Sequence, residues 1–302
     1  MGAKLEEQLR VKIADFIALS PSNRLRGAKS GHIYEEPLVG FARGEDPVFK
    51  QYKIIIGEFH LTPLEYLEKL AKEEKKQFTA ANGFASVVSW ILPFSDAVKE
   101  SNRRQTRYPS EEWARGRYYG ELFNDELRRH VTQFLQDEGY LAGAPVLSKR
   151  FYAKRFETVG YASTWSERHI AYAAGLGTFS LSDGLITPKG KAMRCGSVVV
   201  NARLESTERK TTGIRGNCLY FTKGICKRCA ARCPVGAITE RGHDKDRCRG
   251  YASVKMNEYA KTHYGLDTYG CGLCQTNVPC ESGIPGETNL QCLNKENGSV
   301  RG

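Results

Sequence analysis

Cysteines at short, regular spacings are the residues of this sequence whose types and positions most clearly indicate chemistry. In GICKRCAARCPVGAI (Gly224–Ile238), Cys226, Cys229 and Cys233 are separated by two and three residues, and Pro234 follows the third cysteine. Iron–sulfur clusters take cysteine thiolates, and in a run of this spacing the last cysteine ligates the other of two clusters. The segment therefore predicts two clusters. Pro is expected to redirect the chain, so that a short helix begins after it.

A second cysteine run brings the number of candidate ligands to eight. In YGCGLCQTNVPCESGIP, two residues separate the first two cysteines and five separate the second from the third. Each [4Fe–4S] cluster takes four thiolates, so eight cysteines supply two clusters. The crossing pattern predicts a first cysteine set, Cys218, Cys226, Cys229 and Cys280, and a second cysteine set, Cys233, Cys248, Cys271 and Cys274.

Zinc is the alternative metal, because paired C-x-x-C motifs also form zinc ribbons. The three-residue spacing and the Cys-Pro pair favour clusters, which would make the protein brown, whereas zinc gives no colour. Two cysteines remain outside the sets. Cys195 opens an apolar strand and is predicted to be a small core residue, and Cys292 lies near a polar tail and is expected to be free.

The distribution of the cysteines separates two regions of the chain. Of 302 residues, ten are cysteines, all after residue 194 and nine after residue 217. This length allows two domains, predicted as a reductase domain at 1–205 and a ferredoxin-like domain with both clusters at 206–302. The N-terminus lacks the apolar stretch of a secretory signal, and no apolar run approaches the ~20 residues of a membrane span. We therefore expect a cytoplasmic protein without a membrane partner, in which clustered cysteines favour metal over disulfides.

The formal net charge of +11 could indicate a nucleic-acid partner. Two clusters with their thiolates would contribute about −2 each, which leaves an excess of roughly +7. Eight of the basic residues fall within Lys99–His130. Solvated faces of a loop and a helix are the favoured interpretation of this segment. A site for the phosphates of a nucleotide or a cofactor tail is the alternative.

The elements that must position these residues follow from hydrophobic spacing and helix start and stop signals. Helices are predicted at Leu5–Leu19, from Thr62 and Pro63 onward, across Tyr118–Gly139, and from Ser163 or Thr164 to Gly175, and strands at Ala85–Leu92 and Cys195–Leu204. Helices that alternate with strands indicate the α/β or α+β class. From about residue 206 the chain is rich in Cys, Gly and Arg with short elements, a composition that needs a staple such as a metal.

The stretch ERHIAYAAGLGTFSLSDGLITPKGKAMRCGSVVV (Glu167–Val200), followed by the two cysteine runs, resembles the shared core of the epoxyqueuosine reductases and reductive dehalogenases. These families are cobalamin-dependent iron–sulfur reductases. The segment Trp113–Val131 is similar to an ARGRDYH stretch of the epoxyqueuosine reductases. The resemblance covers roughly residues 85 to 285, and it identifies the chain as a divergent, short, soluble member of this superfamily.

The resemblance implies a nitroreductase-like α/β domain that binds a corrinoid without its lower axial base. Two [4Fe–4S] clusters would relay electrons to the cobalt from a low-potential donor of the ferredoxin or flavodoxin type. Gly175 and Gly177 would let the backbone approach the corrinoid tail, and further contacts would come from Ser180, Leu185, Ile186 and Thr187. A helix end followed by a turn is the alternative interpretation of these glycines.

The sequence departs from the family pattern at several positions. Seven residues separate Cys218 from Cys226 where the family has two, and Glu281 replaces the usual proline after Cys280. Tyr161 occupies the position of the catalytic Asp of the epoxyqueuosine reductases, six residues before the matching Glu, and reductive dehalogenases use a Tyr as proton donor. Tyr161 is therefore predicted to be the catalytic acid.

A nearby cation would make the phenol of Tyr161 a better proton donor, and Arg168 and Arg194 are the candidates. A core aromatic residue with a satisfied hydroxyl is the alternative role of Tyr161. The predicted function is that of a cobalamin-dependent reductase that cleaves a substrate bond, with a small molecule favoured over tRNA. Two alternatives stay open: an electron-transfer protein or corrinoid activator without its own substrate, and a tRNA-modifying epoxyqueuosine reductase.

Overall fold

An antiparallel sheet of four strands forms the centre of the structure, a computed structural model that describes residues 4–27, 31–80, 83–157, 159–210 and 213–286. The strands β1 (Leu38–Arg43), β2 (Ser86–Pro93), β8 (Met193–Val200) and β3 (Ala142–Gly143) follow one another in the order β1-β2-β8-β3. In the register, Val88 of β2 lies opposite Phe41 of β1 and Val198 of β8. Every neighbouring pair of strands is antiparallel. The sequence indicated either the α/β or the α+β class, and an antiparallel sheet with helices belongs to the α+β class.

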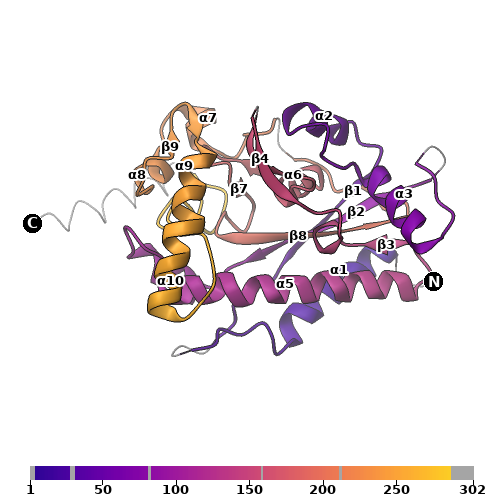
Figure 1. Cartoon of the computed structure of the whole chain (residues 1–302), viewed down its shortest axis with the longest axis horizontal. Coiled ribbons are helices and arrows are strands. Elements are labelled where there is room, and N and C mark those ends of the chain that lie inside the picture. The colour runs from indigo at the N-terminus through magenta and orange to yellow at the C-terminus, as the bar shows by residue number, and fades with distance from the viewer. Residues whose placement is uncertain (1–3, 28–30, 81–82, 158, 211–212, 287–302) are drawn as a thin grey trace, which may run out of the picture.

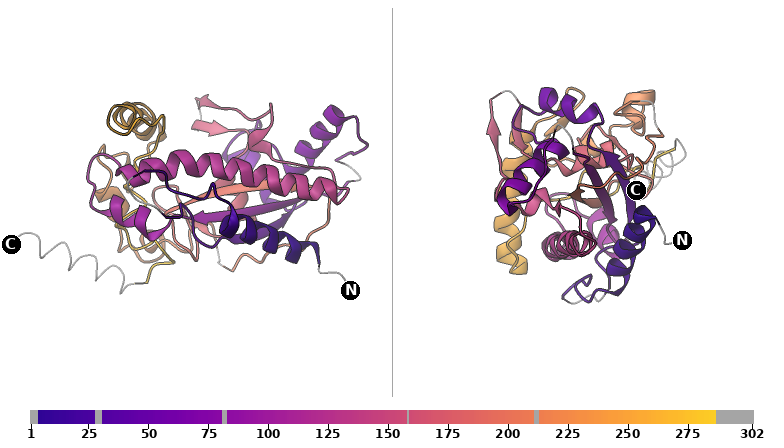
Figure 2. Two further views of the ribbon diagram at one scale, coloured as in Figure 1. Left: turned by 90° about the horizontal axis from the view of Figure 1, so that it is seen from below. Right: turned by 90° about the vertical axis from the view of Figure 1, so that its right-hand side faces the viewer.

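The two faces of the sheet bury alternate side chains of β2, since successive residues of a strand point to opposite faces. Val88, Trp90 and Leu92 pack with α1 (Leu5–Leu19) and α5 (Glu111–Asp137). Val87 and Ile91 pack on the other face with α2 (Val48–Ile55), α3 (Pro63–Glu74) and α6 (Glu167–Ala173). Figures 1 and 2 show the resulting three layers, with the long α5 running along one face of the sheet.

Several predicted elements are confirmed, with small shifts of their ends. The helix over Leu5–Leu19 has the predicted bounds, and α3 begins as expected at a capping box in which Thr62 and Glu65 bond to each other's backbone N–H groups. The predicted strand at Ala85–Leu92 is β2, all of whose residues are buried. The helix predicted across Tyr118–Gly139 is α5, which begins earlier, after its N-cap Ser110.

The predicted start of the helix that carries Glu167 is wrong. α6 begins after Ser166, because Ser163 and Thr164 belong to a β-hairpin and the turn that leaves it. This hairpin pairs β4 (Ala153–Phe156) with β5 (Gly160–Ser163). The Ser163 hydroxyl donates to the carbonyl of Trp165, and the Thr164 hydroxyl donates to that of Arg150, so neither side chain is free to cap a helix.

Short elements make up the region that holds most cysteines. They are α7 (Leu219–Lys223), α8 (Arg228–Ala231), the hairpin of β9 (Ile238–Thr239) and β10 (Gly242–His243), α9 (Lys245–Arg249), a π-helical turn (Gly250–Lys255) and α10 (Met256–Tyr264). The helix predicted after Pro234 is absent. A turn stands there instead, because Gly236 has a φ of +62°, and the chain then enters β9.

Three further elements connect these regions: α4 (Asp96–Arg103) precedes α5, and β6 (Thr178–Phe179) pairs with β7 (Leu185–Ile186). A segment after β8, Leu204–Arg209, runs beside β1. Thr207 both donates its N–H to the carbonyl of Phe41 and accepts the N–H of Phe41 on its hydroxyl. The Ser206 hydroxyl accepts the N–H of Arg43. The predicted domain boundary at residue 205 falls within this segment and stays a prediction.

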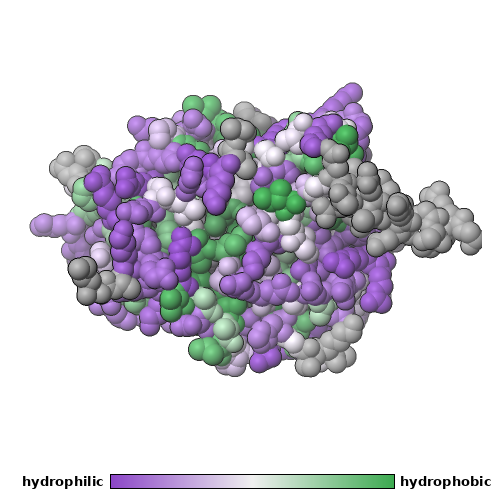
Figure 3. Space-filling model, turned by 180° about the vertical axis from the view of Figure 1, so that it is seen from behind, coloured by the Kyte–Doolittle hydropathy of each residue, from purple (hydrophilic) through white to green (hydrophobic). Residues whose placement is uncertain are grey.

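Among the described residues, no helix is both long enough and apolar enough to cross a membrane. Hydrophilic residues cover most of the face shown in Figure 3, with apolar patches between them. Cys292 lies outside the described residues.

Candidate metal centre

The four cysteines of the first set line one small cavity of about 20 Å³. Cys218 is the N-cap residue of α7, Cys229 lies within α8, and Cys280 belongs to the loop that follows α10. The other residues that line the cavity are Ser180, Ile186, Lys191, Leu219, Val278, Pro279 and Pro285. The cavity is thus bounded mainly by sulfur and apolar groups, with one buried ammonium.

The thiols of the first set are close enough to affect one another electrostatically. Burial raises the pKa of Cys280 to about 11, Lys191 opposes that shift, and the thiols of Cys229, Cys226 and Cys218 add to it. Burial also raises the pKa of Cys226, and Cys229 and Cys218 contribute in the same direction. Buried neutral thiols bind metal only by losing their protons, so metal binding here releases protons.

The second cysteine set shows the same mutual influence. Burial raises the pKa of Cys248, in α9, to about 12, and Cys274 and Cys233 add to the shift. Burial raises the pKa of Cys271 to about 12 as well, with contributions from Cys274, Cys248 and Cys233. The sulfur of Cys233 accepts the N–H of Ala237 at 3.2 Å, a bond of the kind that stabilises a thiolate.

The two sets adjoin each other at Cys274. Burial raises the pKa of Cys274, while Lys191 lowers it and Cys229 of the first set raises it. In the described ranges, no group of three or more His, Cys, Asp or Glu side chains is arranged to hold a single metal ion. A tetrahedral zinc, about 2.3 Å from each sulfur, draws its ligands close together, whereas a cluster places irons and sulfides between them. Four thiols that line one cavity, without the close grouping that a single ion requires, fit a cluster.

The Glu281 side chain fixes the loop from Cys274 to Cys280. The Glu281 carboxylate accepts the N–H of Asn277, which has a φ of +53°, at 2.5 Å and binds Arg103 at 2.6–2.7 Å. The carbonyl of Glu281 also accepts the N–H of Lys191 at 3.0 Å. A charged side chain and its backbone carbonyl thus hold this loop.

Contacts from the α4–α5 region hold the second cysteine run. The amide of Asn102 donates to the carbonyl of Cys271 at 3.1 Å, and the indole of Trp113 donates to the carbonyl of Gly270 at 3.1 Å. Gly272 packs so closely on Trp113 that an added Cβ would lie 2.0 Å from the indole. Arg232 donates to the carbonyls of Gln105 and Leu273, and so joins the two regions.

Tyr161 lies on β5, half-buried, with the guanidinium carbon of Arg249 4.0 Å from its ring centroid. Arg249 follows Cys248 directly, so the tyrosine is placed beside the second cysteine set. The hairpin is fixed there by an ion pair between Arg155 and Asp246 at 2.9 Å. The expectation that Arg168 or Arg194 supplies the cation is therefore corrected. Arg168 donates to the carbonyl of Asp183, and Arg194 pairs with Glu121.

Gly175 ends α6 in a Schellman motif. Its own N–H bonds to the carbonyl of Tyr172, and the N–H of Leu176 bonds to that of Ala171. Gly175 has a φ of +72°, and an added Cβ would lie 2.8 Å from the carbonyl oxygen of Glu208. The glycine therefore lets the chain turn and pack against itself.

The other residues expected to touch a corrinoid are also packed within the chain. A Cβ on Gly177 would lie 2.4 Å from the carbonyl oxygen of Ile186. Ser180, Leu185, Ile186 and Thr187 are at most 3% exposed. Ser180 and Ile186 line the cavity of the first cysteine set. Together with Gly175, these residues pack within the chain, and their contact with a corrinoid stays a prediction.

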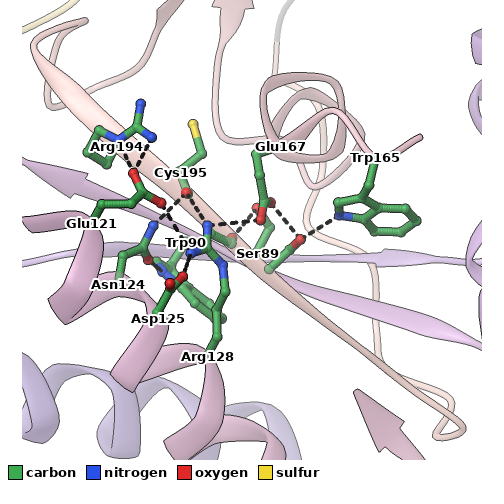
Figure 4. A network of polar contacts seen from close by, with 12 residues as sticks. Ser89, Trp90, Glu121, Asn124, Asp125, Arg128, Trp165, Glu167, Arg194 and Cys195 are labelled. Carbon is green, nitrogen blue, oxygen red and sulfur yellow. Dashed lines mark hydrogen bonds and ion pairs between the residues drawn. The ribbon is translucent and has the colours of Figure 1, made fainter. Parts of the chain in front are cut away.

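A charged network, which the sequence did not single out, joins α5, α6 and β8 (Figure 4). Arg128, 1% exposed, pairs with Asp125 at 2.6 Å, with Glu167 at 3.1 Å and with Glu121 at 3.3 Å. Glu121 also binds Arg194. Burial opposes the ionisation of Glu121, but Arg194 and Arg128 outweigh it and lower its pKa to about 2.

The interpretation of Lys99–His130 as solvated faces holds for the exposed Arg103, Arg104, Arg107 and Arg129, but not for three other basic residues. Lys99, Arg117 and Arg128 within this segment are at most 8% exposed. One signal in the sequence could have predicted this pairing. Acidic and basic residues recur at three- and four-residue intervals on α5, and residues at these intervals are neighbours on a helix. Cys195 is buried in the core beside this network, 7% exposed, as expected.

Fold and site together define a mixed α/β protein with two adjoining sets of buried and half-buried cysteines. No protein-family model matches the chain. No curated protein matches it either.

Solved structures of epoxyqueuosine reductase are similar to the chain. The enzyme from Bacillus subtilis has a TM-score of 0.47 and 18% identity over 83% of this chain and 63% of its own. A selenomethionine-labelled epoxyqueuosine reductase gives 0.46 and 18% over the same shares. An epoxyqueuosine reductase with an epoxyqueuosine-modified tRNA-Tyr stem loop gives 0.46 and 16% over 93% and 67%. The chain thus spans less than two thirds of the length of the first two.

Proposed function

We propose that this chain is an iron–sulfur oxidoreductase that holds two [4Fe–4S] clusters and passes electrons between them one at a time. The observation that supports this most is the cavity lined by Cys218, Cys226, Cys229 and Cys280, which brings the last of these from the second cysteine run beside the other three. The second set adjoins the first at Cys274, which shares its surroundings with Cys229. A low-potential ferredoxin or flavodoxin type of protein is the proposed donor.

The finer proposal is that a small molecule is reduced beside the second cluster and receives its proton from Tyr161. The position of Tyr161 under the Arg249 guanidinium, next to Cys248, supports this assignment. A corrinoid is the electron acceptor that the sequence resemblance implies. Because the six residues expected to touch it are packed within the chain, no step is assigned to a corrinoid, and its presence is a question of cobalt content.

Anaerobic purification followed by iron, sulfide and cobalt analysis tests the proposal. Two [4Fe–4S] clusters require about eight irons and eight sulfides per chain, and the reduced protein should give two electron paramagnetic resonance signals. A chain that retains only zinc, or about four irons, contradicts the proposal. Incubation of micromolar protein with cobalamin then tests for corrinoid binding, which would shift the cobalt spectrum to the base-off form.

An electron-transfer protein or activator without a corrinoid is the second candidate, and the packing of Gly175 and Gly177 against the chain's own carbonyls favours it. This candidate predicts full cluster content with no cobalamin binding. A tRNA substrate is distinguished by salt, because phosphate contacts weaken steeply as salt rises. If tRNA is the substrate, a tRNA stem loop should bind at low salt and dissociate at high salt. If a small molecule is the substrate, no such salt-sensitive binding is expected.

A further inference from the structure

Lys191 places a buried ammonium group between the two cysteine sets. The residue is 1% exposed and lines the cavity of the first set. Its backbone N–H donates to the carbonyl of Cys280 at 2.9 Å, and its ammonium donates to the Ser182 hydroxyl at 3.0 Å. The hydroxyl of Ser182 also bonds to the sulfur of Cys274. The side chain is therefore linked to both sets.

Two glycines make room for the side chain of Lys191 and for the backbone around it. A Cβ on Gly184 would lie 3.0 Å from the Cδ atom of Lys191 and 3.2 Å from its Cγ atom, so the apolar stem runs directly over the glycine. Gly190, just before the lysine, has a φ of +85°, and a Cβ there would lie 2.0 Å from the carbonyl oxygen of Glu281. Both glycines let the lysine enter the space between the sets.

The ammonium has no carboxylate partner among the described residues, although a buried charge is costly unless it is compensated. The groups that favour its protonated form are the sulfurs of Cys280, Cys229, Cys274 and Cys218. Three of these belong to the first set and one to the second. The compensating negative charge is therefore that of the thiolates and whatever they bind.

We propose that Lys191 is a positioning residue whose fixed positive charge raises the reduction potential of the first cluster above the value that the cysteines alone would give. The inference rests on the proposed function. A [4Fe–4S] cluster that accepts one electron from a reductant becomes more negative by one charge, and a nearby cation stabilises that reduced form. The effect is expected to be larger on the first cluster, because three of the four sulfurs that act on Lys191 belong to the first set.

Anaerobic redox titration with dithionite, followed by electron paramagnetic resonance, tests this role. Lys191→Met removes the charge and keeps the length of the side chain. We expect full iron content but at least a tenfold lower equilibrium constant for one-electron reduction of the first cluster, about 59 mV. Lys191→Arg keeps the charge and should restore much of the potential. Lys189→Met is the matched control, since Lys189 lies two residues away, 37% exposed, and pairs with Glu36.

The outcomes separate this inference from the proposed function. A wild-type protein without two clusters overturns both. Two clusters in the wild type with unchanged potentials in Lys191→Met overturn the inference alone. If Lys191→Met loses its iron, Lys191→Gln decides, because it removes the charge and keeps a polar group that can bond to the Ser182 hydroxyl. Unshifted potentials in that variant contradict the inference, and a downward shift supports it.

Discussion

Burial and metal binding act in opposite directions on the cysteine thiols. Burial raises the pKa of both Cys248 and Cys271 to about 12, so without metal these thiols are protonated at neutral pH. Cluster assembly must displace those protons, so the assembly is expected to be more favourable at higher pH than at lower pH. The N–H of Ala237 on the sulfur of Cys233 is one group already placed to stabilise the thiolate.

Cys233→Ala tests the crossing of the ligands between the two cysteine runs. Although Cys233 is close in sequence to Cys226 and Cys229, it is assigned to the set of Cys248. We expect the variant to lose the second cluster and to keep the first, so that about half of the iron remains. Iron analysis and electron paramagnetic resonance measure the result. Cys195→Ala is the control with a buried thiol outside both sets, and it should keep all the iron. A Cys233→Ala protein with both clusters intact would show that the crossing is wrong.

Tyr161→Phe tests the assigned proton donor. The variant removes only the hydroxyl and keeps the ring under Arg249, so cluster content should not change. Loss of a general acid typically slows a reaction on the order of 10²–10⁴-fold. We expect reduction of a halogenated phenol probe, driven by reduced viologen, to slow at least about a hundredfold. Equal rates for both proteins would leave Tyr161 as a packing residue.

Among the elements, the loop Cys274–Cys280 depends on one buried carboxylate. Glu281→Ala leaves the N–H of Asn277 and the guanidinium of Arg103 without their partner. We expect a loss of about 1–3 kcal/mol of stability, visible as a lower thermal midpoint under anaerobic conditions. Glu36→Ala is the matched control, because Glu36 forms an exposed pair with Lys189, and such pairs contribute about 0–1 kcal/mol. Equal midpoint shifts in the two variants would contradict the role of Glu281.

The N-terminus of α6 is held by a histidine that burial keeps neutral. His60, 0% exposed, accepts the N–H of Ser166, and burial lowers its pKa to about 4. Because the unfolded chain binds the proton near pH 6.5, stability falls as pH drops below that value. From pH 7.5 to 5.5 the loss through His60 is about 1.4 kcal/mol.

His60→Gln should therefore lose part of this pH dependence. Urea unfolding at pH 7.5 and 5.5, followed by tryptophan fluorescence, measures the slope in both proteins. The slope that remains is expected from His169, whose pKa burial lowers to about 3. His169→Gln is the companion variant. An unchanged slope in His60→Gln would show that the histidine is not neutral in the folded protein.

Sequence patterns predicted the elements with a clear hydrophobic period, such as α1, α5 and β2, because burial of one face determines them. The patterns gave wrong elements where residues make local hydrogen bonds or turns that hydrophobic spacing does not reveal. Ser163 bonds to Trp165 rather than capping α6, and Gly236 turns the chain before β9. Spacing predicted that the cysteines of the first set lie together, and they line one cavity. The assignment of ligands to two clusters stays a prediction. The positions of Lys191 and Arg249 were not predictable, because each reaches its site only through contacts between distant segments.

At the scale of the whole molecule, the sheet with its helices and the cysteine region differ in the interactions that stabilise them. Large apolar cores fill both faces of the sheet, whereas the core of the cysteine region is small and contains Cys218, Cys229 and Cys280 themselves. Metal binding contributes directly to the folding of such a region. The two regions should therefore respond differently to the loss of iron.

Hydrogen exchange of the protein with and without its iron tests this difference. After removal of the iron under anaerobic conditions, we expect fast exchange across 218–280 and continued protection of β2 and β8. The intact protein is the reference for both regions. Equal loss of protection in the two regions would mean that the clusters hold the entire fold together.

The way β1 is flanked has a consequence for solubility. As the outermost strand, β1 would present unpaired backbone groups able to recruit a strand from another molecule. Instead, Arg10 binds the carbonyl of Val39, Thr207 satisfies both backbone groups of Phe41, and Ser206 accepts the N–H of Arg43. Side-chain hydroxyls and a guanidinium close this border of the sheet without adding a strand. The same short segment that carries the chain from the sheet toward the cysteines therefore also protects the protein against edge-to-edge aggregation.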